Sequence, residues 1–554
     1  MIRKLFYLSI LLVSLFLLFA ISGCRSLPKE LSTPENLRVE KRVIHWDAVE
    51  NASEYVVKIN DSEYTVSECS FPAYSLTAKG GSYQIQVKAC ADDGKYSNSA
   101  WVKINAEFEA AQLHAYDESG YEYTLLKDMS GYELSLGKNQ NIIGSIVIPA
   151  SFGDYPVKRI ADYAFNSYPS FPNEFTESLC NIVTTGIILP ECLESIGMNA
   201  FSYMVRLEEI VIPNSVTTID FGAFSGCTHL KKVTLPEGLK SIPERCFLNT
   251  ALDEIVLPSS LQTIEASAFK CEYRDKETYG YPIEHVYSQL SQIVIPNSVK
   301  RIEASAFSGR ENLASIVWSD TVEWLDLKVF EKTQWYEDQP DGFVMLGSFL
   351  YRYKGELPEN VEITIPAEVK RIAGGAFQGQ KKLCAVVIGD GIQLSGGSIF
   401  SGCINLSEVI LPNDLLQIPA NCFAQTDALK AISLPETVTY IGIAAFAGSG
   451  LECIDIPSSV KAIDERAFNA CTDLADVRFS PSLESLESKA FGGCTSLSHI
   501  FYEGTDDMLA ELIDIEAHRL SYYFHTGSVY YYSEQEPTNG GNFWHYVNGI
   551  PTIW

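Results

Sequence analysis

The chain has 554 residues, 46 % of them hydrophobic, and is therefore long enough for two or more domains with buried cores. Its 41 lysines and arginines are outnumbered by 70 aspartates and glutamates, which gives a net charge of -29 at pH 7 and a pI of about 4.7. Because this charge repels a phosphate backbone, the composition excludes a nucleic-acid-binding protein. The charge keeps a long chain in solution; attraction of a basic ligand or of calcium is the alternative explanation.

The amino terminus has the features of an export signal. Arg3 and Lys4 precede an uncharged apolar stretch, 5–21, and small residues follow it up to Cys24. The alternative is an uncleaved membrane helix, because about 17 apolar residues is near the lower limit for spanning a bilayer. In either case, everything after Cys24 is expected to lie outside the cytoplasm.

The four residues Ile-Ser-Gly-Cys that end at Cys24 resemble a bacterial lipobox. The resemblance implies that 1–23 is a lipoprotein signal peptide and that Cys24 is the lipid attachment site. Residues 24–30 are then a lipidated tether. Two or three acyl chains would anchor the protein stably to a membrane, where one chain would not.

Residues 31–106 predict a separate β domain, with short alternating segments such as Tyr55-Val56-Val57 between turn residues. The segment resembles a fibronectin type III domain. This implies a β-sandwich with Trp46 in its core and Tyr83 at a tyrosine corner. A spacer that lifts the rest of the chain from the membrane is one role for it, and a dedicated binding module is the other.

From residue 145 to residue 503 one short pattern recurs, and an Ala-Phe pair or a close variant marks each copy. Within two runs, neighbouring phenylalanines are 22 or 23 residues apart. A fixed period of this size predicts a solenoid of stacked units, each of which needs its neighbour to bury its apolar face. We expect a mainly β fold with about 12 rungs, marked by Phe201, Phe224, Phe247, Phe269, Phe307, Phe330, Phe377, Phe400, Phe423, Phe446, Phe468 and Phe491.

One copy explains the spacing. Val233 and Leu235 alternate with Thr234, which is the period of a strand with one buried face. Pro236 ends this strand, a second short strand follows, and Phe247 fills the interior of the coil. Stacked copies would form parallel strands roughly 4.8 Å apart. The outward side chains of the first strand would then form a ladder of Val211, Thr234, Val256, Val294, Val317, Thr364, Val387, Ile410, Ser433, Asp455 and Arg478.

The repeated lines, such as 210–227, resemble the BspA-like, or treponemal-type, leucine-rich repeats of bacterial surface proteins. The resemblance covers roughly 120–503. It implies an extracellular binding surface, often an adhesin for host proteins or other microbes, and implies no particular ligand. Residues 107–144 and 504–554 are expected to cap the two ends of the solenoid.

Three intervals exceed the period, and insertions at one point of a repeat emerge on one side of a solenoid. The third, between Phe330 and Phe377, resembles a recurrent hairpin of the family and is expected to be structural. The other two carry aromatic residues that cannot all be buried, and exposed aromatics are common recognition elements. These insertions either bind a ligand or only decorate the solenoid; their candidate binding residues are Tyr168, Phe171, Phe175, Tyr273, Tyr279, Tyr281 and Tyr287.

Removing Cys24 from the 14 cysteines leaves an odd number, and most of the others fall at fixed places in the repeat. Cysteines at such positions are most simply small buried hydrophobic residues. A bridge between Cys471 and Cys494 is disfavoured, because side chains in register point the same way. Whether Cys69 and Cys90 pair is left open.

The sequence has no nucleophile elbow, phosphate loop or zinc motif, so we expect no enzyme, no cofactor and no metal. A weaker alternative is an enzyme with its site in the C-terminal cap. There, three histidines lie near two carboxylates: His518, His525, His545, Asp514 and Glu516.

Taken as a whole, the sequence predicts a membrane-anchored lipoprotein of the cell surface or outer membrane. Its solenoid would bind an extracellular protein or glycan, and its lipid would bind the membrane. The main alternative is a structural or accessory envelope lipoprotein that docks a partner protein.

Overall fold

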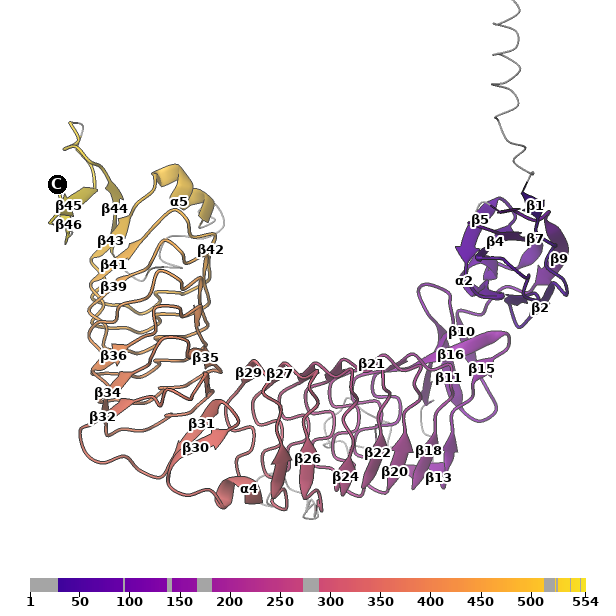
Figure 1. The fold of residues 1–554 in the computed structure, drawn as a ribbon, viewed down its shortest axis with the longest axis horizontal. Helices are drawn as coiled ribbons and strands as arrows, with labels where there is room; N and C mark the ends of the chain where they lie inside the picture. The colour runs from indigo at the N-terminus through magenta and orange to yellow at the C-terminus, as the bar shows by residue number, and fades with distance from the viewer. Residues whose placement is uncertain are drawn as a thin grey trace, which may run out of the picture. The chain divides into compact units, whose positions relative to one another are not determined.

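The structure is a computed structural model that describes residues 28–92, 95–136, 142–166, 182–272, 288–512, 524, 527–538, 540–548 and 550–554. The chain divides into two compact units (Figure 1). The first reaches Leu134 and includes Ala150–Lys158; the second comprises Ser135–Pro149 and Arg159–Trp554. Within the described ranges, no helix is long and apolar enough to cross a membrane.

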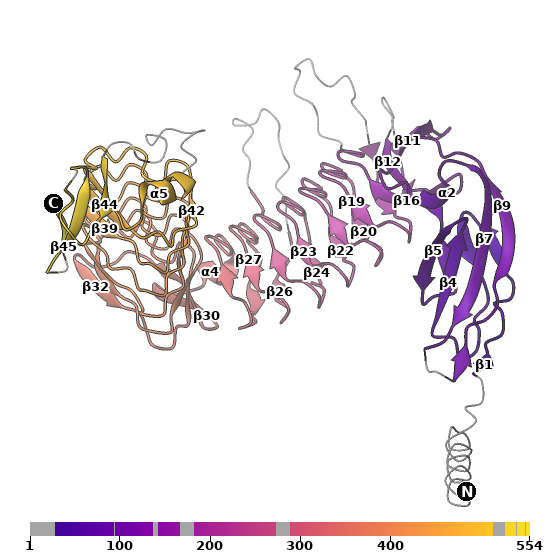
Figure 2. The ribbon, with the colours of Figure 1, turned by 90° about the horizontal axis from the view of Figure 1, so that it is seen from above.

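The first unit begins with two antiparallel sheets, and the strands of the larger one are labelled in Figure 2. A three-stranded sheet has the order β2-β3-β6, and a four-stranded sheet has the order β5-β4-β7-β9. Alternating buried residues in β4 and β7 face a shared core. The elements are β1 Lys29–Glu30, β2 Arg38–Glu40, β3 Val43–His45, β4 Glu54–Ile59, β5 Ser62–Val66, β6 Ser70–Pro72, α2 Tyr74–Thr77, β7 Gly81–Cys90, β8 Tyr96–Ser97 and β9 Val102–Phe108.

Two expectations for this domain are confirmed. Trp46 is 3 % exposed in the core, edge-on to Tyr55 with their ring centroids 5.4 Å apart. The hydroxyl of Tyr83 donates to the carbonyl of Gly80 at 3.3 Å, which is the backbone contact of a tyrosine corner. Cys69 and Cys90 are free thiols, so the disulfide that the sequence left open is not formed.

Arg42 ties the sandwich to the hairpin of Ala150–Lys158 within the first unit. Its guanidinium lies 4.9 Å from the ring centroid of Phe108 and 4.7 Å from that of Tyr155. It donates to the carbonyl of Thr77 at 2.7 Å. These contacts stabilise the positive charge of a side chain that is almost fully buried, although its Nε has no hydrogen-bond partner. The strands that follow the sandwich are β10 His114–Tyr116, β11 Tyr121–Leu125, β12 Tyr132–Leu136, β15 Ser151–Phe152 and β16 Tyr155–Ile160.

The second unit is the predicted solenoid, and most turns contribute a first strand to parallel sheets on one side of the coil (Figure 1). Isoleucine, valine and leucine point inward from these strands, and the Pro that follows in most turns ends them. The first strands are β13 Ile142–Ile143, β14 Ile146–Val147, β17 Ile182–Val183, β18 Gly186–Ile188, β20 Glu209–Val211, β22 Lys232–Thr234, β24 Glu254–Ile255, β26 Gln292–Val294, β28 Ser315–Val317, β32 Val361–Thr364, β34 Leu383–Val387, β36 Glu408–Ile410, β39 Cys453–Asp455, β41 Asp476–Phe479 and β43 His499–Tyr502.

A second, shorter strand follows in most turns and forms a separate parallel sheet on the other side of the coil. Most of these strands bury one residue, as the Leu-x-x-Ile spacing predicts, and β33 and β35 bury two. They are β19 Ser195–Ile196, β21 Thr218–Ile219, β23 Ser241–Ile242, β25 Thr263–Ile264, β27 Arg301–Ile302, β29 Trp324–Leu325, β33 Arg371–Ala373, β35 Gln393–Ser395, β37 Gln417–Ile418, β38 Tyr440–Ile441, β40 Ala462–Ile463 and β42 Ser485–Leu486.

The repeated phenylalanines form a stacked ladder inside the coil. Successive rings in each run have centroids 4.9–5.6 Å apart and planes within 15° of parallel. The solenoid has about 14 turns, so the expected 12 was too few. Phe165 stacks on Phe201 at one end and Phe524 on Phe491 at the other. The sequence count omitted both because long intervals separate them from their neighbours.

The third insertion is structural, as predicted. After the short helix α4 (Gln334–Glu337), β30 (Gly342–Leu346) and β31 (Phe349–Lys354) form an antiparallel hairpin, and β31 joins the second-strand sheet through β33. Tyr351 continues the ladder where the phenylalanines stop. Its ring lies 6.0 Å from that of Phe330, and its hydroxyl accepts from the Phe330 amide at 2.9 Å.

The chain ends in a cap that extends the first-strand sheet. Strand β44 (Ser528–Tyr532) pairs in parallel with β43, β45 (Phe543–Val547) pairs with β44, and β46 (Ile550–Ile553) closes the edge. The helix α5 covers Asp506–Leu512. Trp544 is fully buried there, and its indole nitrogen donates to the carbonyl of Tyr502 at 3.2 Å.

Cysteines of the repeat are buried and free, as expected, and they also donate hydrogen bonds. Each thiol donates to the phenylalanine carbonyl of the preceding turn at 3.1–3.2 Å. Burial raises the pKa of Cys227 and of Cys403 to about 12, which keeps these thiols protonated and able to donate. The four are Cys227, Cys403, Cys471 and Cys494.

Most turns also hold residues at positive φ on both sides of the phenylalanine. Glycine takes some of these places, such as Gly448 at φ 67° and Gly493 at φ 73°. Other turns have residues with a Cβ, such as Ala470 at φ 59°. The left-handed conformation costs an L-residue roughly 1–2 kcal/mol, so these places are strained.

We therefore expect Ala470→Gly to stabilise the protein by about 0.5–1 kcal/mol, because relief of strain outweighs the entropy that glycine loses on folding. Ala470 is exposed, so no buried methyl is lost. Chemical denaturation measures the change. The matched control is Ala447→Gly in the preceding turn, at a position without positive φ, which should be destabilising. Equal loss of stability in both variants would contradict the prediction.

Candidate ligand-binding surface

The outward side chains of the first strands line one side of the solenoid, which we call the first-strand face. The predicted ladder is confirmed, because inward residues such as Ile210 and Val233 are buried while their neighbours face solvent. In the first run the row is apolar and 43–80 % exposed, at Val147, Ile188, Val211, Val256, Val294 and Val317. A parallel row beside it is polar, at Glu209, Lys232, Glu254 and Gln292. Exposed apolar side chains rimmed by polar ones are typical of interaction surfaces.

The same face becomes polar late in the second run, at Ser433, Asp455 and Arg478. Arg478 is held by two carboxylates: its Nε lies 2.9 Å from Asp455 Oδ1, and its Nη1 lies 3.2 Å from Glu503 Oε1. Its hydrogen bond to Asp455 is the main cause that raises the pKa of Arg478. The hydroxyl of Tyr546 donates to Glu503 at 2.8 Å, so the cap contributes to this charged cluster.

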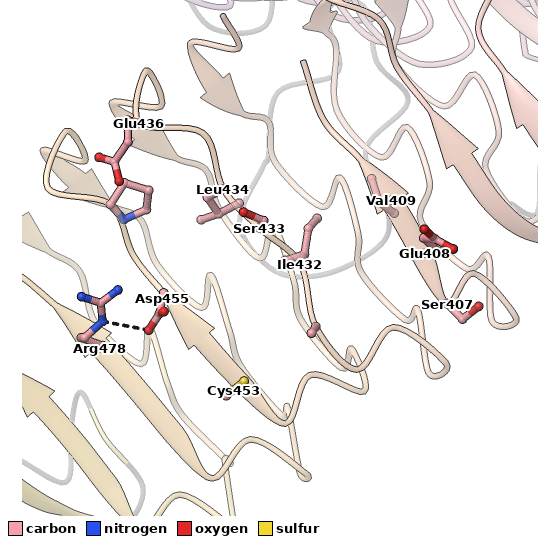
Figure 3. Close-up of a pocket in the computed structure, with 12 residues that line it drawn as sticks. Ser407, Glu408, Val409, Ile432, Ser433, Leu434, Glu436, Cys453, Asp455 and Arg478 are labelled. Carbon is pink, nitrogen blue, oxygen red and sulfur yellow. Dashed lines mark hydrogen bonds and ion pairs between the residues drawn. The ribbon is translucent and has the colours of Figure 1, made fainter. Parts of the chain in front are cut away.

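Between these regions the sheet is interrupted, and a groove of about 470 Å³ lies at the interruption. Figure 3 shows the segment that carries Ile432, Ser433 and Leu434 running as coil beside the strand of Asp455. Strand β36 ends one sheet and β39 begins another. We call this hollow the 431–434 groove; it has both apolar and charged lining residues, which include Glu408, Val409, Ile432, Leu434, Glu436, Cys453, Asp455, Pro457 and Arg478.

A one-residue deletion coincides with this interruption. Phe446 and Leu451 are five positions apart, whereas Phe423 and Leu429 are six apart, so the later turn is one residue shorter. The chain closes the shortened turn at Gly450, where a Cβ would lie 2.0 Å from the carbonyl oxygen of Asp427.

Comparison with known families identifies these repeats. The model of the BspA type leucine-rich repeat region, in six copies, matches residues 139–275, 284–338, 346–475 and 398–509, which is more than half of the chain. The chain belongs to the BspA-type leucine-rich repeat family. The first-strand face is therefore the outer surface of the leucine-rich repeat sheet.

Solved structures include similar leucine-rich repeat proteins. One from Bacteroides ovatus is 24 % identical, with coverage of 75 % of this chain and 99 % of that one and a TM-score of 0.32. A leucine-rich cell surface protein from Faecalibacterium prausnitzii is 24 % identical, with coverage of 73 % and 98 % and a TM-score of 0.30. The pneumococcal vaccine antigen PcpA is 20 % identical, with coverage of 76 % and 94 % and a TM-score of 0.31. No curated protein matches the chain.

The aromatic insertions of this leucine-rich repeat protein lie outside the described residues. This holds for every binding residue predicted in them: Tyr168, Phe171, Phe175, Tyr273, Tyr279, Tyr281 and Tyr287. The lipid attachment residue Cys24 lies outside them as well. The sequence predicted the ladder of the first-strand face but not the 431–434 groove. The sequence signal beside the groove is the interval of 22 residues, instead of 23, between Phe446 and Phe468.

The C-terminal cap shows no assembled catalytic centre among its described residues. His518, His525, Asp514 and Glu516 fall outside them. The ring of His545 lies 3.6 Å from that of Trp554. Among the residues that the structure describes, no three His, Cys, Asp or Glu side chains group as metal ligands.

Proposed function

We propose that this chain is a lipid-anchored protein of the bacterial cell envelope that binds a protein or glycan outside the cell, in the manner of an adhesin. The observation that carries the proposal is the first-strand face, a row of exposed apolar and then polar side chains presented by a rigid stacked core. Repeat scaffolds commonly bind through such extended surfaces. The chain acts as a binding scaffold and not as an enzyme in this proposal.

The N-terminal sandwich is proposed to be a fibronectin type III-like spacer. Its strand orders, β2-β3-β6 and β5-β4-β7-β9, support this, as do the buried Trp46 and the hydrogen bond of Tyr83. In the proposed arrangement Cys24 carries the lipid, a short tether follows, and the sandwich separates the repeats from the membrane.

Replacing Cys24 with alanine tests the anchor. We expect the variant to lose acylation, to leave the detergent phase on phase separation and to retain its signal sequence uncleaved, because the lipidated cysteine directs cleavage after Gly23. Mass spectrometry of the amino-terminal peptide measures both changes, with Cys69→Ala as the control. An acylated Cys24→Ala protein would contradict the anchor.

Binding is tested with the fragment from residue 25 onward, immobilised and exposed to host matrix proteins, mucin glycans and envelope extracts. Changing Val256, Val294 and Val317 together to aspartate should weaken capture at least tenfold, about 1.4 kcal/mol, because charges would replace the apolar row. The fold should survive, since these side chains face solvent. Surface plasmon resonance on the captured ligand measures the loss.

The matched comparison is the change of Tyr279, Tyr281 and Tyr287 together to alanine. If capture survives the valine changes and fails with these, the insertions are the binding surface and the first-strand face is not. Capture confined to envelope extracts would favour the alternative function, an accessory lipoprotein that docks a partner in the same envelope.

A further inference from the structure

The 431–434 groove contains backbone groups that the fold leaves unpaired. In regular turns the residue after the first strand donates to the next turn, as in Ile388 N to Ile410 O at 3.0 Å and Ile456 N to Arg478 O at 2.9 Å. Within the described range 288–512, no backbone hydrogen bond joins 431–434 to β36 or to β39. A sheet that opens in this way offers amide and carbonyl groups to another strand.

The charge around the groove is negative. Glu408 and Glu436 are exposed at its rim, and Asp455 contributes a third carboxylate. Arg478 pairs with Asp455 and with Glu503 outside the groove, so it offsets the charge of those two carboxylates. The negative charge offered to a ligand is therefore that of Glu408 and Glu436. In Figure 3 the Glu408 and Glu436 carboxylates lie on opposite sides of the coil that carries Ser433.

Apolar residues make up part of the lining between these carboxylates. They are Val409, Ile432, Leu434 and Pro457, and Ile432 is half-buried. A surface with apolar side chains between acidic rims suits lysine and arginine side chains, whose aliphatic stems pack on apolar groups while their charged ends reach carboxylates. The groove volume lies within the usual range of ligand sites.

We propose that the 431–434 groove binds an extended, positively charged segment of a partner polypeptide. The peptide backbone pairs with the free amide and carbonyl groups of the opened sheet, and its basic side chains reach Glu408 and Glu436. This inference rests on the proposed function, because it names the ligand class for one part of the first-strand face. It also accounts for the break in an otherwise regular ladder.

The test uses the full chain in detergent and a fluorescent peptide of alternating lysine and threonine, which favours an extended strand. Anisotropy should show saturable binding, and the double change Glu408→Gln and Glu436→Gln should weaken it at least tenfold. Bound peptide should also slow alkylation of Cys453, an exposed thiol in the groove. Mass spectrometry of the alkylated peptides follows that protection.

Two controls separate this site from general attraction to an acidic protein. The change of Glu209 and Glu254 to glutamine removes the same charge from the same face where the sheet is intact, and it should leave binding within twofold. A peptide with the same charges but alternate N-methylated amides should bind at least tenfold more weakly. Equal effects of the two double variants, or full binding of the N-methylated peptide, would overturn the proposal.

Failure of the groove proposal can be distinguished from failure of the proposed function, in which the apolar row binds the ligand. If the valine changes abolish ligand capture and the Glu408 and Glu436 changes affect neither capture nor the peptide, the proposed function stands and this inference fails. If ligand capture survives both the valine changes and the Glu408 and Glu436 changes, the first-strand face is not the surface that captures the ligand. Whether the groove binds the basic peptide is then judged from the anisotropy measurements and their two controls alone.

Discussion

Replacing Phe423 with alanine is expected to lower the free energy of unfolding by about 3–5 kcal/mol. Phe423 is fully buried, and its ring stacks on those of Phe400 and Phe446 with both centroids 5.4 Å away. Its removal opens a cavity between rungs that the backbone cannot close, because neighbouring turns are hydrogen-bonded to each other through Phe423 N to Ala445 O. Chemical denaturation of the fragment from residue 25 onward measures the loss.

The control for this change is Phe221→Ala, which removes a half-buried phenylalanine outside the ladder. It should cost less than about 1.5 kcal/mol. Because solenoid stability is carried by contacts between neighbouring turns, hydrogen exchange should accelerate first in the rungs on either side of Phe423. An unchanged denaturation midpoint for Phe423→Ala would mean that the Phe423 ring does not contribute to the packing of the solenoid core.

Periodic features of this fold could be predicted because one physical requirement recurs in every turn. Each copy must bury two short strands and one ring, so the spacing of Val233, Leu235 and Phe247 was enough to assign the inward positions. The outward ladder followed from alternation alone. The count of turns was wrong because Phe165 and Phe524 lie across long intervals, where the period gives no guidance.

The 431–434 groove and the buried Arg310 could not be predicted in this way, because each occurs in one turn and is not repeated. The shorter interval after Phe446 is visible in the sequence, but an equal interval follows Phe247, where β22 and β24 remain paired. The structure distinguishes these two short turns: the turn after Phe446 passes close to the Asp427 carbonyl at Gly450, and the neighbouring segment 431–434 is unpaired. Sequence also gave no reason to regard Arg310 as anything but a surface residue.

Arg310 is the other departure with a large expected effect. It occupies the place that Cys227 holds in its own turn, three residues after the phenylalanine, yet it is fully buried. Its Nε donates to the carbonyl of Phe269 at 2.5 Å, which is the bond that the cysteine thiol makes in other turns. Burial lowers the pKa of Arg310.

The rest of the guanidinium reaches one turn further into the stack. Nη1 donates to the carbonyl of Thr250 at 2.5 Å, and Nη2 donates to the Thr250 hydroxyl at 2.9 Å and to the carbonyl of Phe247 at 3.2 Å. Among the described residues no carboxylate forms an ion pair with it. One side chain therefore joins three consecutive turns through backbone carbonyls beside the second insertion.

Arg310→Ala is expected to cost at least about 4 kcal/mol. The carbonyls of Thr250 and Phe269 would each lose a donor in the interior, at about 1–3 kcal/mol apiece, and the empty volume adds a cavity term. Phe247 keeps a partner, because the Thr250 hydroxyl donates to its carbonyl at 2.9 Å. Denaturation with hydrogen exchange measures the loss, which should concentrate in the turns of Phe247, Phe269 and Phe307.

Arg310→Cys separates the two parts of this contact. The thiol restores the bond to the Phe269 carbonyl as in the regular turns but cannot reach Thr250, so its cost should fall between wild type and Arg310→Ala. Arg301→Ala is the matched control in the same turn, because its exposed guanidinium pairs with Glu303 at 2.9 Å and should contribute no more than about 1 kcal/mol. If Arg310→Ala costs no more than this control, the buried guanidinium does not hold the three turns together. If Arg310→Cys matches wild type, the bond to Phe269 is the only one that contributes to stability.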